Sequence, residues 1–300
     1  MEKLDRSVLY NIHSAGNKPG ITVRPGQEFF AETELCTGDW LKSVDDRFSN
    51  DKRKGSPNPT VVIEVEGAKP GDVAIVHIHD IVPDAIGYTG FDTEKNNPLA
   101  ALIYPREWPL TTRTVRISDG FILWSDKLKI PVSPMIGTLG VAPDRGESLL
   151  NSKGGYYGGN MDVQEVCAGA SVWLPVSVPG ALLHVGDVHA IQGDGEICSG
   201  GGIECRSVVR LSIDIAKKPA AMNWPRVVNE SHIMTVCCHR TVEESFYHGT
   251  RDLINWMVED YGFEVGEAYM LLSQVMEARA TQFVNPTYSY VCKIAKKYLV

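Results

Sequence analysis

The stretch Ser207-Val208-Val209-Arg210-Leu211-Ser212-Ile213-Asp214-Ile215 decides the fold class of this chain. Apolar residues occupy every second position, and a period of two places them on one face of a β-strand. Short runs of the same kind recur between residues 20 and 240, separated by Pro-Gly and Asp-Gly pairs that mark turns. One such pair, Asp119-Gly120, predicts a β-hairpin. Because crossover helices are missing between these runs, the pattern favours a sandwich or barrel over a parallel α/β sheet.

Helix signals concentrate near the C-terminal end. Thr241 and Glu244 have the spacing of a capping box, and Gly262 is placed to end the helix that they begin. Apolar residues between 268 and 276 repeat with the helical period and predict a second helix. We therefore expect three regions: an N-terminal β-rich domain at 1–150, a second β-rich region with the active site at 151–225, and a C-terminal α+β unit at 226–300.

Composition excludes several classes of function. The 300 residues carry 29 Lys and Arg against 37 Asp and Glu, a net charge of −8 that argues against nucleic-acid binding. No segment approaches the roughly 20 apolar residues of a membrane helix, and the N-terminus lacks an apolar signal stretch, so we expect a cytoplasmic protein. The seven cysteines form no C-x-x-C pair, which argues against a zinc finger. Strand edges and apolar helices make a homodimer the expected assembly.

The densest polar segment, Gly186 to Glu196, is the first candidate site. Asp187 and His189 follow an apolar run, and residues two apart on a strand share one face. A Gly-Asp-Gly turn then returns Glu196 toward the same rim. A mixture of nitrogen and oxygen ligands suits zinc, whereas carboxylates alone suit calcium or magnesium. The alternative is that the Asp-Gly pairs are only turns and that His189 is a hydrogen-bonded core histidine.

Three other segments carry candidate chemistry. The glycine-rich stretch 154–162 offers oxygen ligands from Asn160 and Asp162, although it can equally be a surface loop. His77 and His79 share a strand face that is otherwise apolar, which favours core or inter-subunit histidines. Cys198 lies near His189 in sequence and is a candidate nucleophile for a metal-free amidase.

Several motifs together resemble those of the acetamidase/formamidase family. They are Gly186 to Glu196, Pro134 to Pro143, Gly158-Gly159-Asn160-Met161-Asp162, Glu267 to Ser273 and Pro70-Gly71-Asp72. The resemblance covers most of the chain. It implies a jelly-roll-like β-sandwich, a β-barrel-like part and a small α+β C-terminal piece. It also implies hydrolysis of short aliphatic amides, with a divalent metal in some members. The family often carries histidine where this sequence has Tyr157, and this chain departs from it again after Asn58-Pro59.

From these residues we form a hypothesis for the site. Asp162, Asp187 and His189 hold a divalent metal, with zinc expected first and calcium as the alternative. Glu196 carries the proton to the departing nitrogen. We expect two further catalytic residues. Asn160, or a backbone amide of the glycine-rich stretch, stabilises the oxyanion, and Asp194, like Glu204, is a reserve for the carboxylate roles. Tyr157, Gly158 and Gly159 are expected to bind substrate. The competing functions are the Cys198-dependent amidase and a non-catalytic β protein that binds a small molecule or metal.

Overall fold

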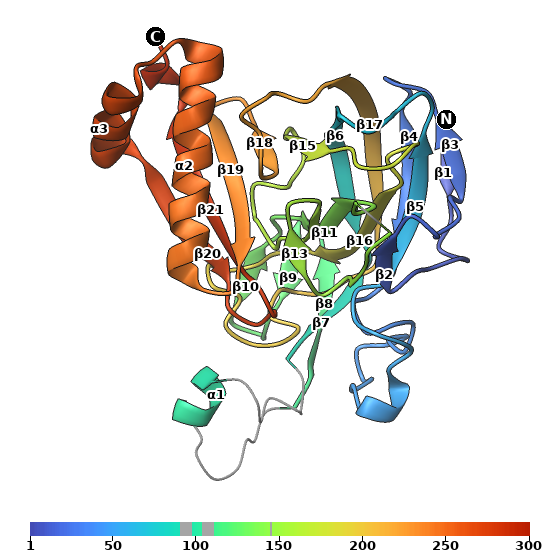
Figure 1. Cartoon of the computed structure of the whole chain (residues 1–300). Coiled ribbons are helices and arrows are strands. Elements are labelled where there is room, and N and C mark those ends of the chain that lie inside the picture. Colours follow the sequence, from blue (N-terminus) through green and yellow to red (C-terminus); the bar gives the residue numbers. More distant parts are fainter. Residues whose placement is uncertain (91–97, 104–110, 145) are drawn as a thin grey trace.

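The computed structural model describes residues 1–90, 98–103, 111–144 and 146–300, and it is dominated by β-strands (Figure 1). The described strands form a nine-stranded sheet, a six-stranded sheet, a four-stranded sheet and a two-stranded pair. The predicted mainly β architecture is therefore confirmed.

The nine-stranded sheet is built around the stretch that decides the fold class. That stretch lies in β17, which pairs antiparallel with β4 on one side and with β6 on the other. In spatial order the strands are β1 (Glu2–Leu4), β4 (Phe29–Thr33), β17 (Ser207–Lys217), β6 (Asp72–Pro83), β15 (Ser171–Pro175), β18 (Arg226–Val228), β19 (His232–His239), β21 (Tyr288–Ala295) and β20 (Glu277–Gln282).

The six-stranded sheet packs against this large sheet. Its strands are β13 (Gly154–Gly155), β14 (Gly158–Asn160), β11 (Met135–Val141), β16 (Leu183–His189), β5 (Thr60–Val65) and β3 (Ile21–Val23). Apolar side chains of both sheets share one buried cluster, in which Val76 and Leu174 of the large sheet join Leu139 and Val185 of the smaller one. Every residue of β11 and β16 is buried, so these two strands lie in the interior of the sandwich.

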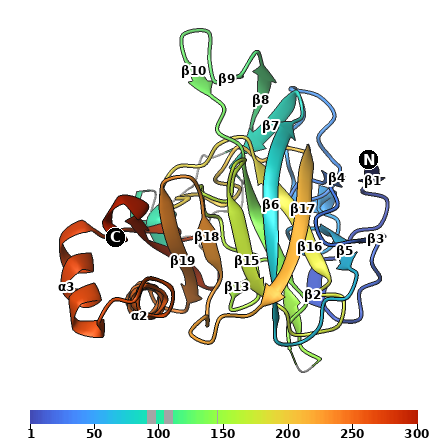
Figure 2. The same ribbon diagram turned by 90° about the horizontal axis from the view of Figure 1, so that it is seen from above.

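The four-stranded sheet carries the predicted hairpin. It consists of β10 (Lys129–Pro131), β9 (Phe121–Leu123), β8 (Arg113–Ser118) and β7 (Ile86–Thr89), and it projects from the sandwich (Figure 2). Asp119 and Gly120 join β8 to β9 with φ angles of 54° and 79°, the left-handed pair that a tight hairpin turn requires. The two-stranded pair is β12 (Ser148–Leu150) with β2 (Ile12–Ser14).

The C-terminal helices cover one end of the large sheet (Figures 1 and 2). Helix α2 (Val242–Tyr261) begins where the Thr241 side chain accepts a hydrogen bond from the Glu244 backbone and ends at Gly262 with φ of 73°, as predicted. Helix α3 (Val265–Val275) follows it. Leu253, Trp256 and Met257 of α2 pack on Ile233 and Ile294 of the sheet, which gives this end its own apolar core.

Strands from all three predicted regions share the nine-stranded sheet, so the regions are not spatially separate; the boundaries near 150 and 225 stay a prediction. Among the described residues, the remaining helical segments are α1 (Pro98–Ile103) and two short 3-10 turns, Asn50–Lys52 and Lys296–Tyr298. Within the described part of the chain, every helix is too short or too polar to cross a membrane.

Candidate active site

Adjacent strands of the six-stranded sheet bring the candidate acids together. Asp162 follows β14, and Asp187 and His189 lie on β16, while β11 runs between these two strands. The β11 residue Gly137 leaves the necessary space. A Cβ atom at this position would lie 2.5 Å from Asp162 Oδ1 and 2.8 Å from Asp187 Oδ2. A glycine on the central strand is therefore what lets the two carboxylates approach each other.

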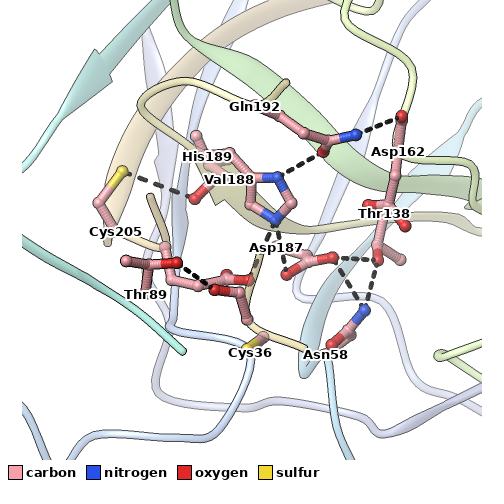
Figure 3. A network of polar contacts seen from close by, with 12 residues as sticks. Cys36, Asn58, Thr89, Thr138, Asp162, Asp187, Val188, His189, Gln192 and Cys205 are labelled. Atoms are coloured by element: carbon pink, nitrogen blue, oxygen red, sulfur yellow. Dashed lines mark hydrogen bonds and ion pairs between the residues drawn. The ribbon is translucent and has the colours of Figure 1, made fainter. Parts of the chain in front are cut away.

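His189 faces the carboxylates with one nitrogen and is held by the other (Figure 3). Nδ1 contacts Gln192 Oε1 at 2.8 Å. Since that oxygen can only accept, Nδ1 carries the proton and Nε2 is left as the basic nitrogen of the neutral ring. Nε2 lies 3.5 Å from Asp187 Oδ1 and 3.3 Å from Glu204 Oε1. Gln192 in turn donates to the backbone oxygens of Asp162 and Thr281, so the imidazole has a fixed orientation.

Asp187 is bound on its second oxygen by neutral donors. Asn58 Nδ2 donates to Oδ2 at 2.8 Å and Thr138 Oγ1 donates to it at 3.1 Å, as Figure 3 shows. Asn58 also donates to Asn160 Oδ1 at 2.7 Å. These bonds hold Asp187 with Oδ1 turned toward His189.

Asp162, like Asp187, has one oxygen that accepts hydrogen bonds from neutral donors and one that faces the cluster. Its Oδ2 accepts from Asn160 Nδ2 at 2.8 Å and from Asn285 Nδ2 at 2.7 Å. Asn285 lies in the loop between β20 and β21, so the C-terminal hairpin reaches into the site. Asn160 therefore orients Asp162, and its position favours a positioning role over stabilisation of an oxyanion.

Five polar atoms converge here while lacking a hydrogen-bond partner among the described residues. They are Asp162 Oδ1, Asp187 Oδ1, His189 Nε2, Glu196 Oε2 and Glu204 Oε2. All five residues are at least nine-tenths buried. Ligand atoms of Asp162, His189 and Glu196 lie within 4.8 Å of one another, and a second set with this spacing comprises Cys36, Asp187 and Glu204. Buried polar atoms usually have partners, so this concentration indicates a site that binds something.

Backbone strain is concentrated at the same place. Asn58, Asp162, Asp187 and Glu196 adopt φ angles of 61°, 50°, 56° and 39°. Non-glycine residues rarely adopt this left-handed region, and such strain persists where the surrounding structure enforces it, often at functional sites. The strain at Asp187 lies opposite Gly137, where the ladder of β11 and β16 passes from Ile136–Val188 to Thr138–Gly186.

The electrostatics follow from burying several acids beside one base. Burial, reinforced by the negative charge of Asp187, raises the pKa of Asp162 to about 8. Burial likewise raises the pKa of Glu204 to about 7 against the opposing pull of His189, and it raises the pKa of Glu196. Burial lowers the pKa of His189, but attraction to Glu204 and Asp187 outweighs it, and the net pKa rises. These acids cannot all be ionised at neutral pH unless a cation joins them.

Two cavities adjoin the cluster. The smaller has a volume of about 250 Å³, and its lining includes Asp187, Glu196 and Glu204. The larger, about 1060 Å³, lies against Gln192 and Cys198. Ionisable groups therefore line the smaller cavity, and its size suits a molecule of a few non-hydrogen atoms.

Other predicted site residues lie outside the cluster. Asp194 has an exposed side chain that pairs with Arg279 at 2.7 Å, because its turn directs it to the surface. Its position does not support the catalytic role that we expected. Tyr157 is buried, donates to the Lys153 backbone oxygen and packs against His13. Gly158 and Gly159 pass close to the backbone of neighbouring strands, so with Tyr157 they shape the sheet, and their predicted substrate contacts stay a prediction.

The remaining candidate segments have ordinary partners. His77 contacts Ser171 at 2.8 Å and Asp214 at 3.0 Å, and His79 contacts Ser212 at 2.8 Å. Both histidines have hydrogen-bond partners within the sheet, but they are half-buried and do not lie in the core. Cys198 Sγ lies 3.9 Å from Thr89 Oγ1. Both nitrogens of His189 face other groups, so this geometry does not form a cysteine–histidine pair.

Five residues of the site were not predicted from the sequence: Asn58, Thr138, Gln192 and Asn285, which orient the acids, and Cys36. Gln192, Thr138 and Asn58 lie in or beside segments quoted for the family resemblance, but the sequence assigned none of them a role. The others come from distant loops, and an uncharged amide or hydroxyl carries no distinctive sequence signal.

Fold and site together define a mainly β protein with a buried carboxylate–imidazole centre beside a small cavity. A model of the Acetamidase/Formamidase family matches residues 153–294. A crystal structure of acetamidase from Yersinia enterocolitica is 31% identical and superposes with a TM-score of 0.91, covering 100% of this chain and 93% of that one. The chain belongs to the acetamidase/formamidase family.

Other relatives agree with this assignment. The structure of a predicted acetamidase/formamidase from Thermoanaerobacter tengcongensis is 30% identical, with a TM-score of 0.88 over 99% of this chain and 96% of that one. The acetamidase of Mycolicibacterium smegmatis is 27% identical over 257 residues, which are 65% of this chain and 63% of that protein. A putative formamidase of Schizosaccharomyces pombe matches over 50% of its own length, so the chain spans about half to two thirds of these two relatives.

Proposed function

We propose that this protein hydrolyses the C–N bond of short aliphatic amides, such as formamide and acetamide, to a carboxylate and ammonia. The observation that carries the proposal is the group of buried carboxylates around the His189 imidazole, beside the 250 Å³ cavity. The names of the relatives support the substrate class, since they are acetamidases and formamidases.

The donor set fits a divalent ion. Asp162 and His189 have ligand atoms within 4.8 Å of each other, and Asp187 Oδ1 lies 3.5 Å from His189 Nε2. All three side chains are buried, and each is a group that zinc prefers. We assign these three residues to the ion. Such an ion supplies a water of near-neutral pKa and polarises the amide carbonyl.

The remaining side chains of the site have separate tasks. Gln192 fixes the tautomer of His189, and Asn58 and Asn285 fix the two aspartates, so the three ligands need little reorganisation. Glu196 has a buried oxygen without a partner, within 4.8 Å of ligand atoms of Asp162 and His189. From this position it accepts the proton of the attacking water and delivers it to the departing nitrogen, so that ammonia leaves as a neutral molecule.

The direct test is ammonia release from formamide, acetamide and propionamide by the purified full chain loaded with Zn²⁺. The proposal predicts turnover of at least one amide, its loss on chelation and its return when Zn²⁺ is restored. Folded, zinc-loaded protein that releases no ammonia from any of them would contradict it. Activity that survives chelation but disappears on iodoacetamide labelling would favour the Cys198-dependent amidase instead.

A further inference from the structure

We propose that Cys36, Asp187 and Glu204 form a second divalent-metal site beside the first, so that the chain holds two ions joined by shared carboxylates. Ligand atoms of these three residues lie within 4.8 Å of one another, and all three side chains are buried. A thiolate with carboxylates is a donor set that suits zinc. The inference rests on the proposed function only for the position of the first ion.

Two unsatisfied oxygens mark this second set. Glu204 Oε2 and Asp187 Oδ1 have no hydrogen-bond partner in the described part of the chain, and each residue is 2% exposed. Backbone hydrogen bonds hold Glu204 against Tyr88 on β7 in both directions, at 2.8 and 3.0 Å. Its carboxylate is therefore presented by a fixed backbone, and a free oxygen in such a place needs a cation or a donor.

The two sets meet at the carboxylates of Asp187 and Glu204. Asp187 Oδ1 and Glu204 Oε1 both lie within 3.5 Å of His189 Nε2, which belongs to the first set. Both residues also belong to the set of Cys36. Carboxylates that face two ligand sets can bridge two ions, as in other two-metal hydrolytic sites, where the ions lie about 3.5–4 Å apart.

The charge of the cluster favours two ions over one. Asp162, Asp187, Glu196 and Glu204 carry four negative charges when ionised, and Arg53 in the lining of the small cavity offsets at most one. One divalent ion leaves a net negative charge buried in the sandwich, which is costly. The four carboxylates, the Cys36 thiolate and Arg53 together carry a charge of −4, which two divalent ions balance.

A chain of hydrogen bonds connects the Cys36 sulfur to Tyr88, Thr37 and Trp40. Trp40 Nε1, which can only donate, bonds to Thr37 Oγ1 at 2.8 Å. Thr37 and Tyr88 hydroxyls lie 2.7 Å apart, and the Tyr88 hydroxyl lies 3.0 Å from Cys36 Sγ. In both of these hydroxyl and thiol contacts either atom can donate. Burial and the negative charges of Glu204 and Asp187 raise the pKa of the Cys36 thiol, so a thiolate here needs a bound cation, and the Tyr88 hydroxyl can then donate to it.

The test counts zinc in the full chain after loading with Zn²⁺ and removal of excess ion. We expect two zinc ions per wild-type chain and one in Cys36→Ala. Cys205→Ala should retain two, because that thiol is also buried but bonds to Val188 O at 3.5 Å and belongs to neither ligand set. One ion per chain in all three proteins overturns the inference.

X-ray absorption at the zinc edge gives a second, independent readout. A sulfur neighbour at about 2.3 Å is expected in wild type and in Cys205→Ala and should vanish in Cys36→Ala. Spectra without sulfur in folded wild-type protein overturn the second site. If Cys36→Ala unfolds, Cys36→Ser replaces it, with the same expected loss of the sulfur signal. These readouts are independent of turnover: two ions without ammonia release contradict the proposed function alone, and ammonia release with one ion contradicts the second site alone.

Discussion

Replacing Gly137 by alanine tests whether the approach of the two aspartates produces activity. The added Cβ would lie 2.5 Å from Asp162 Oδ1 and 2.8 Å from Asp187 Oδ2, whereas ordinary contacts begin at 3.4 Å. The oxygens must therefore retreat by about 0.9 and 0.6 Å, the differences between these distances. The Asp187 backbone oxygen, 2.9 Å away, also blocks relief by movement of the strand.

Misplacement of a catalytic group by about 1 Å can lower the reaction rate about 10²-fold, which corresponds to a loss of about 2.7 kcal/mol of transition-state stabilisation. We therefore expect kcat/KM of Gly137→Ala to fall by about two orders of magnitude, together with weaker zinc binding. The assay combines ammonia release with zinc content. Gly266→Ala in α3 is the matched control, because its Cβ meets nothing within 4 Å. Wild-type kcat/KM and zinc content in Gly137→Ala would refute the reasoning.

Three further predictions concern the supports of the site and the fold. Asn285→Ala removes a 2.7 Å donor to Asp162 and should lower kcat/KM about tenfold without unfolding the chain; unchanged kinetics would exclude the positioning role. Burial lowers the pKa of His184 from 6.5 to about 4. As the pH drops, His184 is therefore protonated in the unfolded chain before it is protonated in the folded chain. The free energy of unfolding should fall by about 3 kcal/mol between pH 6.5 and pH 4. Urea unfolding should show that the free energy of unfolding falls less with pH in His184→Gln than in wild type. An equal fall in both proteins would show that His184 is not the cause. Thr241→Ala removes the α2 cap and should lower the free energy of unfolding by about 1 kcal/mol with kcat/KM unchanged. Thr241→Ser should keep the wild-type free energy of unfolding. An unchanged free energy of unfolding in the alanine variant would show that the cap does not stabilise the helix.

Local patterns predicted those features that depend on neighbouring residues. The Thr241 cap, the Gly262 stop and the Asp119-Gly120 turn are determined within a few residues, and each is present in the structure. Alternation in the stretch that forms β17 likewise predicted a half-polar strand. Periodicity does not show which strands pair. It therefore could not predict the nine-stranded sheet that joins all three predicted regions.

The site was predicted only where its residues lie close together in the sequence. Asp187 and His189 are close because they share a strand, and Glu196 returns through a short turn, so sequence spacing sufficed. Asp194 belongs to the same turn, but spacing alone does not show that it faces solvent and Arg279. Asn58 and Asn285 reach the aspartates across more than a hundred residues, and only the folded sheet reveals such contacts.

Glu196→Gln gives the most direct measurement of the central claim, that buried acids around His189 perform amide hydrolysis. The substitution keeps the shape of the side chain and removes its ability to take up and return a proton. Turnover of formamide and acetamide should fall about 10²- to 10⁴-fold while the zinc content stays at the wild-type value. A variant that releases ammonia at the wild-type rate would contradict the claim.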